Sequence, residues 1–210
     1  NKLLKNPESI SLAISKPAEG ITQSAYMCHD SQKVNLVREV LRAKGKDLSH
    51  VLIFASSIKS VREIKTTLNK AGMKASEMHS GLDQDQREQT IRDFKSKKIK
   101  ILVATDILSR GIDIKGIEIV INYEVPHDEE DYVHRIGRTA RADRTGEAIT
   151  FINPKQVKNF KDIEKLIEKE VPKLELPKGF SKSPEYKILS KNKKNKKWRN
   201  FKKQKPTSPK

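Results

Sequence analysis

The sequence holds a single cysteine, Cys28, in 210 residues, which excludes an internal disulfide and fits a reducing compartment. The five histidines do not show the spacing of a structural zinc site. No stretch approaches the ~20 consecutive apolar residues of a membrane span, and the first residues lack the layout of a signal peptide. We therefore predict an intracellular, cytoplasmic protein with no bound structural metal and no membrane partner.

Apolar and aromatic residues are scarce, at 35% and 5%, whereas charged residues make up 34% and the net charge is +17. Much of this charge lies in residues 181–210, which hold twelve Lys or Arg against one acid. Such a segment buries too little apolar surface to offset its chain entropy. We predict a basic, disordered tail there, for which a solubility device is the simplest explanation.

From residue 21 to about 167, short apolar runs alternate with amphipathic stretches, as in a parallel α/β sheet. Strands are predicted at 50–56, 74–80, 100–105, 117–124 and 147–152, with a further one at 21–29. Helices are predicted at 32–45, capped by Asp30 or Ser31, at 58–72, ending at Gly72, and at 85–97, following Asp83. The expected fold is a doubly wound, mostly parallel sheet with helices on both faces and functional loops at the strand carboxyl ends.

Three segments are expected from this pattern. Residues 1–20 form a linker and the remnant of a preceding region, since the chain starts on Asn and contains "SKPAEG". Residues 21–180 form the folded domain, and residues 181–210 form the tail.

Loops after two predicted strands carry polar residues that a plain core does not need. Gln84 and Arg87 open a helix whose first amides can receive a phosphate, although a solvated helix start explains them equally well. The stretch "TDILSRGIDI" places Thr105, Arg110 and Gly111 in one turn, where Thr and Arg can hold phosphate oxygens and Gly allows close approach.

Arginines recur at every third position in "DYVHRIGRTARADRTGEA": Arg135, Arg138, Arg141 and Arg144. A surface helix covered with salt bridges is one explanation. Gly137 weakens a helix at this point, however, and the acids precede the arginines instead of alternating with them. Because Arg suits bidentate phosphate contact, we favour an anionic ligand.

Together, "HRIGRTAR", "ATDILSRGIDI", "VLIFASS" and "HSGLDQDQRE" resemble, in order and spacing, the motifs of the second RecA-like lobe of DEAD-box ATP-dependent RNA helicases, over residues 21–176. His134 favours this branch over DNA-directed helicases. The wording "RTARADRTGEAITFI" is similar to the bacterial RhlE-type subgroup. The sequence has no G-x-x-x-x-G-K-[ST] phosphate loop, no "DEAD" and no Ser-Ala-Thr motif. The resemblance places those motifs, with ATP and Mg²⁺, on an N-terminal RecA-like lobe that is missing here.

The resemblance implies a role for each matching residue, and it implies that this chain alone is inactive and binds no cofactor. The arginines that act on the ATP γ-phosphate are Arg138 and Arg141, the latter being the arginine finger. Residues expected near ATP are Gly111, Asp113, His134 and Arg135. Those expected on single-stranded or locally melted RNA are Gln84, Arg87, Thr105, Arg110 and Gly111, with Trp198 and Phe201 of the tail stacking on bases. We call the stretch from Arg135 to Arg144 the arginine segment. Phe54 is either a support beneath this segment or an ordinary strand residue.

A different class of function remains open at this point. The chain could be a stand-alone module that binds RNA or a protein without any ATPase activity. An upstream lobe with a phosphate loop would favour the helicase.

Overall fold

The computed structural model describes residues 20–45, 48, 50–106, 117–139 and 145–188. Its strands are β1 (Ile21–Met27), β2 (Val51–Phe54), β3 (Ala75–Met78), β4 (Ile101–Ala104), β5 (Ile119–Asn122), β6 (Gly146–Ile152) and β7 (Lys173–Leu174). Its helices are α1 (Asp30–Ala43), α2 (Ile58–Lys70), α3 (Gln84–Lys95), α4 (Glu129–Ile136) and α5 (Val157–Leu166).

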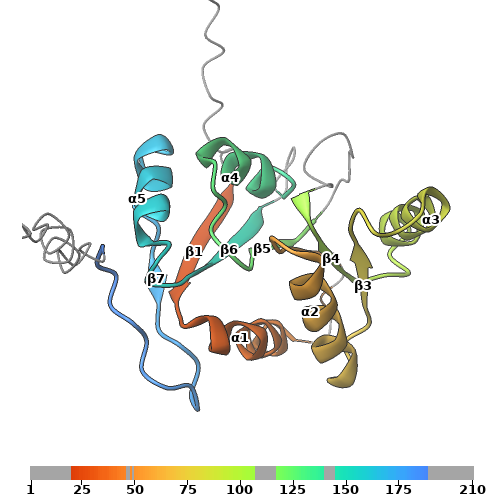
Figure 1. The fold of residues 1–210 in the computed structure, drawn as a ribbon, viewed down its shortest axis with the longest axis horizontal. Helices are drawn as coiled ribbons and strands as arrows, with labels where there is room; N and C mark the ends of the chain where they lie inside the picture. Colours follow the sequence, from red (N-terminus) through yellow and green to blue (C-terminus); the bar gives the residue numbers. More distant parts are fainter. Residues whose placement is uncertain (1–19, 46–47, 49, 107–116, 140–144, 189–210) are drawn as a thin grey trace, which may run out of the picture.

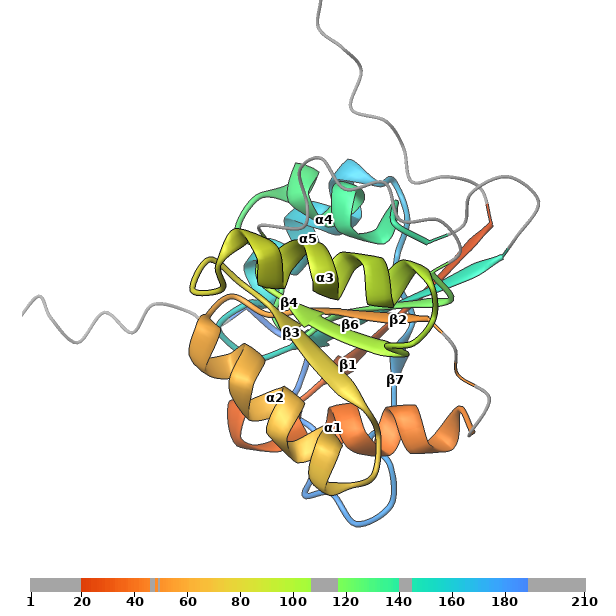
Figure 2. The ribbon, with the colours of Figure 1, turned by 90° about the vertical axis from the view of Figure 1, so that its right-hand side faces the viewer.

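Within these residues the seven strands form one sheet in the order β3-β4-β2-β5-β6-β1-β7, and all paired strands are parallel (Figure 1). Helices α1 and α2 cover one face, and α3, α4 and α5 cover the other (Figure 2). The predicted α/β fold with helices on both faces is therefore confirmed.

The central strands are apolar on both sides because each face of the sheet packs against helices. In β2, Val51 and Ile53 belong to the core beneath α1 and α2, whereas Leu52 and Phe54 belong to the core beneath α3. This alternation follows the two-residue period of a strand. All four side chains are buried, which explains the continuous apolar run in the sequence.

All six predicted strands and all three predicted helices are present, with differences at their ends. Helix α1 begins with His29 at its N-cap, not Asp30 or Ser31. The Gln32 side chain accepts a hydrogen bond from the His29 backbone N–H at 2.7 Å, which places the helix start one residue earlier. The sequence-based predictions omit α4 as a defined helix, α5, and the two-residue strand β7.

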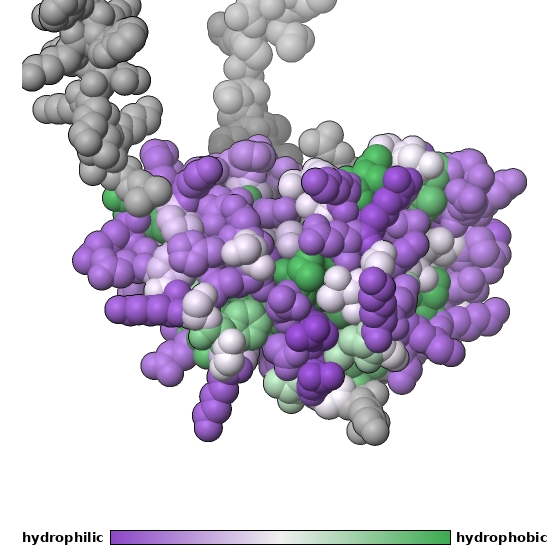
Figure 3. Space-filling view, turned by 60° about the horizontal axis from the view of Figure 1, so that its bottom comes forward, coloured by the Kyte–Doolittle hydropathy of each residue, from purple (hydrophilic) through white to green (hydrophobic). Residues whose placement is uncertain are grey.

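The surface of the described residues is largely polar, as the α1 and α2 face illustrates (Figure 3). Leu174 and Ile188 are the large apolar side chains that stay exposed in this part of the chain. None of the helices in the described ranges combines the length and apolar composition needed to cross a membrane.

A C-terminal strap, residues 175–188, crosses α1 and ends against α5. The Gln32 amide donates to the Ser181 hydroxyl oxygen at 2.8 Å. The Ser183 hydroxyl donates to the last carbonyl of β1 at 2.7 Å. The Tyr186 hydroxyl donates to a carboxylate of α5 at 2.6 Å. These three bonds fix the strap on three elements that are distant in sequence.

Residues 181–188, which the sequence analysis places in the tail, thus make side-chain hydrogen bonds with the domain. The Ser and Tyr side chains of this segment form hydrogen bonds with the domain. Composition alone cannot reveal such contacts, because the lysines make the whole C-terminal region look uniformly basic. The remaining residues, 189–210, lie outside the described ranges, together with the predicted stacking residues Trp198 and Phe201.

Glu164 of α5 joins the strap to the domain. Its carboxylate accepts hydrogen bonds from the Tyr186 hydroxyl and from the Val171 amide at 2.8 Å, and it pairs with Lys173. Burial alone would raise the pKa of Glu164, but these bonds and the Lys173 charge outweigh it and hold the pKa below its ordinary value. The ionised carboxylate therefore stabilises the folded state.

We predict that Glu164→Gln lowers the free energy of unfolding at pH 7 by about 1–3 kcal/mol, since a neutral amide cannot pair with Lys173. Because the folded-state pKa is depressed, this contribution is present above the unfolded pKa of about 4.3 and is lost as the pH falls through the folded value. Urea unfolding from pH 7 to pH 3 measures both effects. The control is Glu170→Gln, an exposed carboxylate 4.0 Å from the same lysine; an equal loss in both variants would contradict the assignment.

Candidate functional site

The carboxyl ends of the parallel strands meet at one edge of the sheet, and α4 lies at this edge. The Asp128 carboxylate caps α4 by accepting from the Glu130 amide at 2.8 Å, and three acids occupy the first turn, where the helix dipole favours them. The helix ends at Ile136. A Cβ at Gly137 would lie 3.0 Å from the Val133 carbonyl oxygen, so glycine suits this tight end.

This end point divides the four arginines. Arg135 lies in the last turn of α4, whereas Arg138 follows the helix end. Helix α4 therefore ends between Arg135 and Arg138, whereas Arg141 and Arg144 lie outside the described ranges.

Arg135 is buried, with 5% of its side chain exposed, and it binds Asp106 directly after β4. Nε donates to Oδ1 and Nη2 donates to Oδ2, both at 2.8 Å, a two-pronged geometry that is among the stronger hydrogen-bonded ion pairs. Nη1 donates to Asn122 Oδ1 at 3.4 Å. The guanidinium carbon lies 5.1 Å from the centre of the Phe54 ring, which confirms Phe54 as a support beneath this segment.

A buried guanidinium needs a partner, because leaving one member of a buried pair uncompensated is strongly destabilising. Asp106 supplies that partner, and the bonds of Arg135 to it stay within this domain. A contact of Arg135 with ATP therefore stays a prediction. The structure shows Arg135 joining α4 to Asp106, two residues after the end of β4.

Three other predicted site residues lie near this pair, at the carboxyl edge of the sheet. Thr105 precedes Asp106 and is partly buried, its amide donating to the Met78 carbonyl at 3.0 Å. His134 is exposed on α4, and Arg138 is partly buried, its amide donating to the Arg135 carbonyl at 3.1 Å. The predicted residues Arg110, Gly111, Asp113 and Arg141 lie outside the described ranges.

Helix α3 carries the other predicted RNA residues. The side-chain Nε2 of Gln84 donates to Glu88 Oε1 at 2.9 Å, and Arg87 Nη2 donates to the Ser80 backbone carbonyl at 2.9 Å. Gln84 is exposed and Arg87 is partly buried. Arg87 is thus held against the loop before α3, at the same edge as Thr105.

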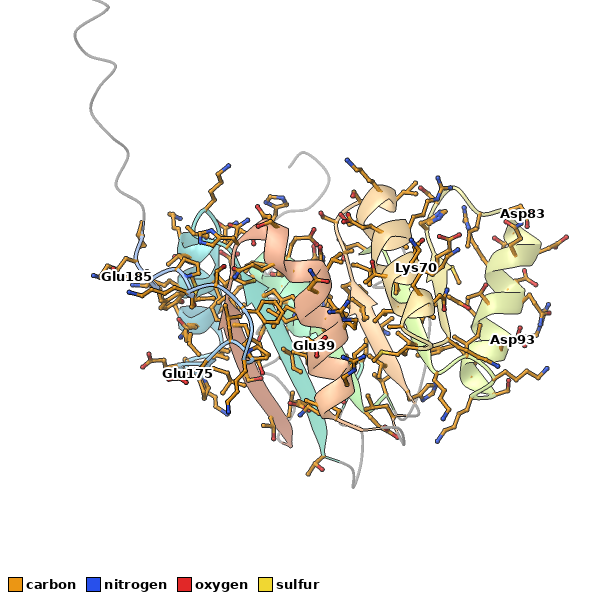
Figure 4. All side chains as sticks on the ribbon, turned by 90° about the horizontal axis from the view of Figure 1, so that it is seen from below. Glu39, Lys70, Asp83, Asp93, Glu175 and Glu185 are labelled. Atoms are coloured by element: carbon orange, nitrogen blue, oxygen red, sulfur yellow. The ribbon has the colours of Figure 1, made fainter. Side chains whose placement is uncertain are left out.

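The first turn of α3 is less suited to an anion than the sequence suggests. Asp83 caps the helix, as predicted, and its Oδ1 already accepts from the Gln86 amide at 2.8 Å. Asp83 lies at one end of α3 and Asp93 near the other (Figure 4). Since Asp83 and Asp85 add negative charge at this end, a phosphate here has to be held by the side chains of Gln84 and Arg87.

A second polar cluster at the same edge is centred on Lys33, which is 1% exposed. Its ammonium pairs with Asp30 at 2.9 Å, donates to Gln156 Oε1 at 3.4 Å and lies 5.7 Å from the Tyr123 ring centre. Sequence patterning does not reveal it, because a lysine in an amphipathic helix is ordinarily solvated. The cluster ties α1 to the loops after β5 and β6.

Glu124, after β5, connects the same region to the segment that follows β2. Its Oε2 accepts from the Ser56 amide at 3.1 Å, and burial raises the pKa of its carboxyl group. Among the described residues no group of three or more His, Cys, Asp or Glu side chains is arranged to hold a metal ion.

Comparisons with known proteins agree with this geometry. Residues 32–143 match the helicase conserved C-terminal domain family. The chain is 38% identical over 170 residues to the probable ATP-dependent RNA helicase ddx49 of Dictyostelium discoideum, covering 77% of this chain and 34% of that protein. The chain spans about a third of the length of the curated relatives that it matches.

Two solved structures have the same fold. A DEAD box protein from Methanococcus jannaschii has a TM-score of 0.68 at 39% identity, covering 74% of this chain and 42% of that one. S. cerevisiae Dbp5, bound to RNA and ADP BeF3, has a TM-score of 0.69 at 28% identity, covering 75% and 42%. The RhlE-type assignment is not confirmed by these relatives. The matched family, the parallel sheet and the arginine segment at its carboxyl edge together show that the chain belongs to the helicase conserved C-terminal domain family, as the C-terminal lobe of a DEAD-box helicase.

Proposed function

We propose that the chain is the second lobe of an ATP-dependent RNA helicase, which acts with a first lobe that holds the nucleotide. The observation that carries this proposal is the pair formed by Arg135 and Asp106. It joins the arginine segment, which the resemblance assigns to ATP, to the loop after β4, which the resemblance assigns to RNA. A lobe that responds to both ligands needs such a connection.

On the ATP side, Arg138 and Arg141 reach the phosphates across the cleft between the lobes. Charge spreads over the transferring phosphoryl oxygens in the transition state, and a cross-domain arginine stabilises it, contributing a factor of roughly 10³ or more in rate. Gly111, Asp113 and His134 line the same edge. The Dbp5 structure with RNA and ADP BeF3 supports a joint nucleotide and RNA state for this fold.

On the RNA side, Gln84, Arg87, Thr105, Arg110 and Gly111 contact phosphates and sugars of single-stranded or locally melted RNA. Contacts of this kind position a strand but carry little sequence information. We therefore expect the lobe to accept many RNA sequences. ATP and RNA together favour the closed arrangement of the two lobes, and hydrolysis returns the open one.

Among the described residues, no group of three or more His, Cys, Asp or Glu side chains could hold Mg²⁺. We therefore assign the Mg²⁺ ligands to the first lobe. We also place the helicase in the cytoplasm. Its one cysteine, Cys28, is buried, and burial raises the pKa of the thiol to about 12, which leaves it protonated and unreactive at neutral pH.

The basic tail adds RNA affinity by a separate route. Glu185 of the strap and Asp83 of α3 lie on opposite sides of the molecule (Figure 4), and the remaining tail residues, 189–210, follow the strap. The sheet edges β7 and β3 are six strand spacings apart, or about 29 Å. We expect the tail to bind RNA beyond the stretch that the lobe itself contacts, with Trp198 and Phe201 stacking on bases.

The purified chain alone should show no RNA-stimulated ATP hydrolysis and only weak ATP binding. Its sequence lacks a phosphate loop and the lysine that such a loop provides. Addition of a cognate first lobe should restore turnover, measured as phosphate release with and without RNA. Turnover by the chain alone would refute the two-lobe proposal, and RNA binding without any turnover in the presence of the first lobe would identify a stand-alone binding module.

In the two-lobe enzyme, Arg141→Ala should lower the turnover number by about a thousandfold, because this arginine acts on transition-state charge. RNA affinity, measured by fluorescence anisotropy, should change little. Arg42→Ala removes an exposed arginine that pairs with Glu39 on α1 and serves as the control. Unchanged turnover in Arg141→Ala would move the finger role to Arg138.

Deletion of residues 189–210 should weaken single-stranded RNA binding about equally for unrelated sequences and reduce its salt dependence. The segment carries ten Lys or Arg and no acid, so its binding releases counterions and makes log K linear in log salt concentration. Trp198→Ala with Phe201→Ala should keep the slope and lower affinity by roughly 1–3 kcal/mol per stacked base. Equal affinity and slope before and after deletion would leave the tail as a solubility device.

A further inference from the structure

A chain of polar side chains crosses the buried centre of the sheet. It lies between β1 and the residues after β4 and has two hydrogen-bonded parts, Gln23 with Tyr132, and Thr150 with Asn122, Arg135 and Asp106. We call it the polar chain. Tyr132, Thr150 and Asn122 are fully buried, in strands and a helix where the neighbouring inward-facing positions are apolar. Buried polar groups cost free energy unless they are paired, so their presence here calls for a role that an apolar residue could not fill.

Asn122, the last residue of β5, is the centre of the polar chain. Its Oδ1 accepts from Arg135 Nη1 at 3.4 Å, and its Nδ2 donates to Thr150 Oγ1 at 3.2 Å. The orientation of the amide follows from these partners, because arginine has donors only and cannot face Nδ2. Arg135 thus determines which way the amide points, and Thr150 holds Asn122 in that orientation by accepting from Nδ2.

The Tyr132 hydroxyl of α4 donates to Gln23 Oε1 of β1 at 2.9 Å. Tyr132 and Arg135 lie one turn apart on α4. The polar chain therefore attaches α4 to the sheet at two points, one on each side of the Asn122–Thr150 pair. A helix attached twice cannot rotate about its axis without breaking one of the bonds.

The polar chain ends at the two segments that the proposed function assigns to different ligands. Arg135 lies three residues before Arg138, and Asp106 lies directly after Thr105. The bidentate contact of Arg135 with Asp106 sets the distance between these segments, and Asn122 sets the direction of the guanidinium. Phe54 supports the guanidinium but offers no hydrogen bond that would fix its rotation.

We propose that Asn122 and Thr150 are positioning residues that orient Arg135, and through it keep the RNA-contacting loop after β4 and the arginine segment in the geometry that couples RNA binding to ATP hydrolysis. The coupling part of this inference rests on the proposed function. Neither residue touches a ligand. They act by holding a buried amide and hydroxyl in one arrangement.

The test compares Thr150→Val, which keeps the side-chain shape and removes the hydroxyl, with Thr150→Ser, which keeps the hydroxyl and removes the methyl. In the two-lobe enzyme, Thr150→Val should lower the RNA-stimulated turnover number about tenfold, since small misplacements of catalytic groups cost this much or more. The KM for ATP should change less than twofold, and Thr150→Ser should retain most of the turnover. Ile163→Val, an apolar change in the α5 core, is the control for destabilisation alone.

A second arm uses this chain by itself, as a folded lobe. The Arg135 Nε–H resonance in a ¹⁵N-detected spectrum should be sharp and slow to exchange in the native lobe and in Thr150→Ser, and broadened in Thr150→Val. This arm needs no ATPase activity. It therefore decides the orientation of Arg135 even if the wild-type two-lobe enzyme shows no RNA-stimulated hydrolysis, an outcome that overturns the proposed function instead.

Three outcomes overturn the inference: an unchanged Arg135 resonance in Thr150→Val, an unchanged turnover number in that variant, or equal losses of turnover in Thr150→Val, Thr150→Ser and Ile163→Val. If Thr150→Val does not fold, Asn122→Ser takes its place, because the shorter side chain cannot reach Arg135 and the same two measurements apply.

Discussion

The ion pair of Arg135 with Asp106 is the interaction on which the arrangement of the carboxyl edge depends. Neither partner is adjacent to the other in sequence, and neither belongs to a strand, yet together they fix α4 to the loop after β4. Removing Asp106 would leave the buried Arg135 charge with its desolvation uncompensated, whereas the Asp106 side chain is 47% exposed and keeps contact with water. The apolar core holds the sheet together, and this pair adds a polar connection from α4 to the residues that follow β4.

The same pair shows why the number of arginines in a motif says little about their tasks. Regular spacing invites one explanation for all of them, whereas the helix end at Ile136 already separates Arg135 from Arg138. Arg135 faces inward and is satisfied by Asp106, Asn122 and the Phe54 ring. A single buried arginine of this kind keeps the following segment at the edge where ligands would approach, while its own charge is neutralised.

Much of the fold could be predicted because strand and helix periods are local signals. The apolar run at β2 and the cap at Asp83 are properties of a few neighbouring residues, and the structure has both. The partner of Arg135 could not be predicted, since Asp106 is one of many acids and only the strand order brings it near. The contacts of residues 181–188 could not be predicted, because this stretch precedes a lysine-rich segment in the sequence and its own Ser181, Ser183 and Tyr186 find partners distant in sequence. The short strand β7 has too few residues for any period to be recognised.

The position of β1 in the sheet has a consequence for biosynthesis. This first strand lies between β6 and β7, and Ile21 pairs with Gly146. Non-local pairings of this kind are slow to form, because a long loop has to close before the contact gains any free energy. As the chain leaves the ribosome, β1 therefore waits without either neighbour until the sixth strand has been made. Until then both edges of β1 lack the backbone partners that β6 and β7 provide in the folded sheet.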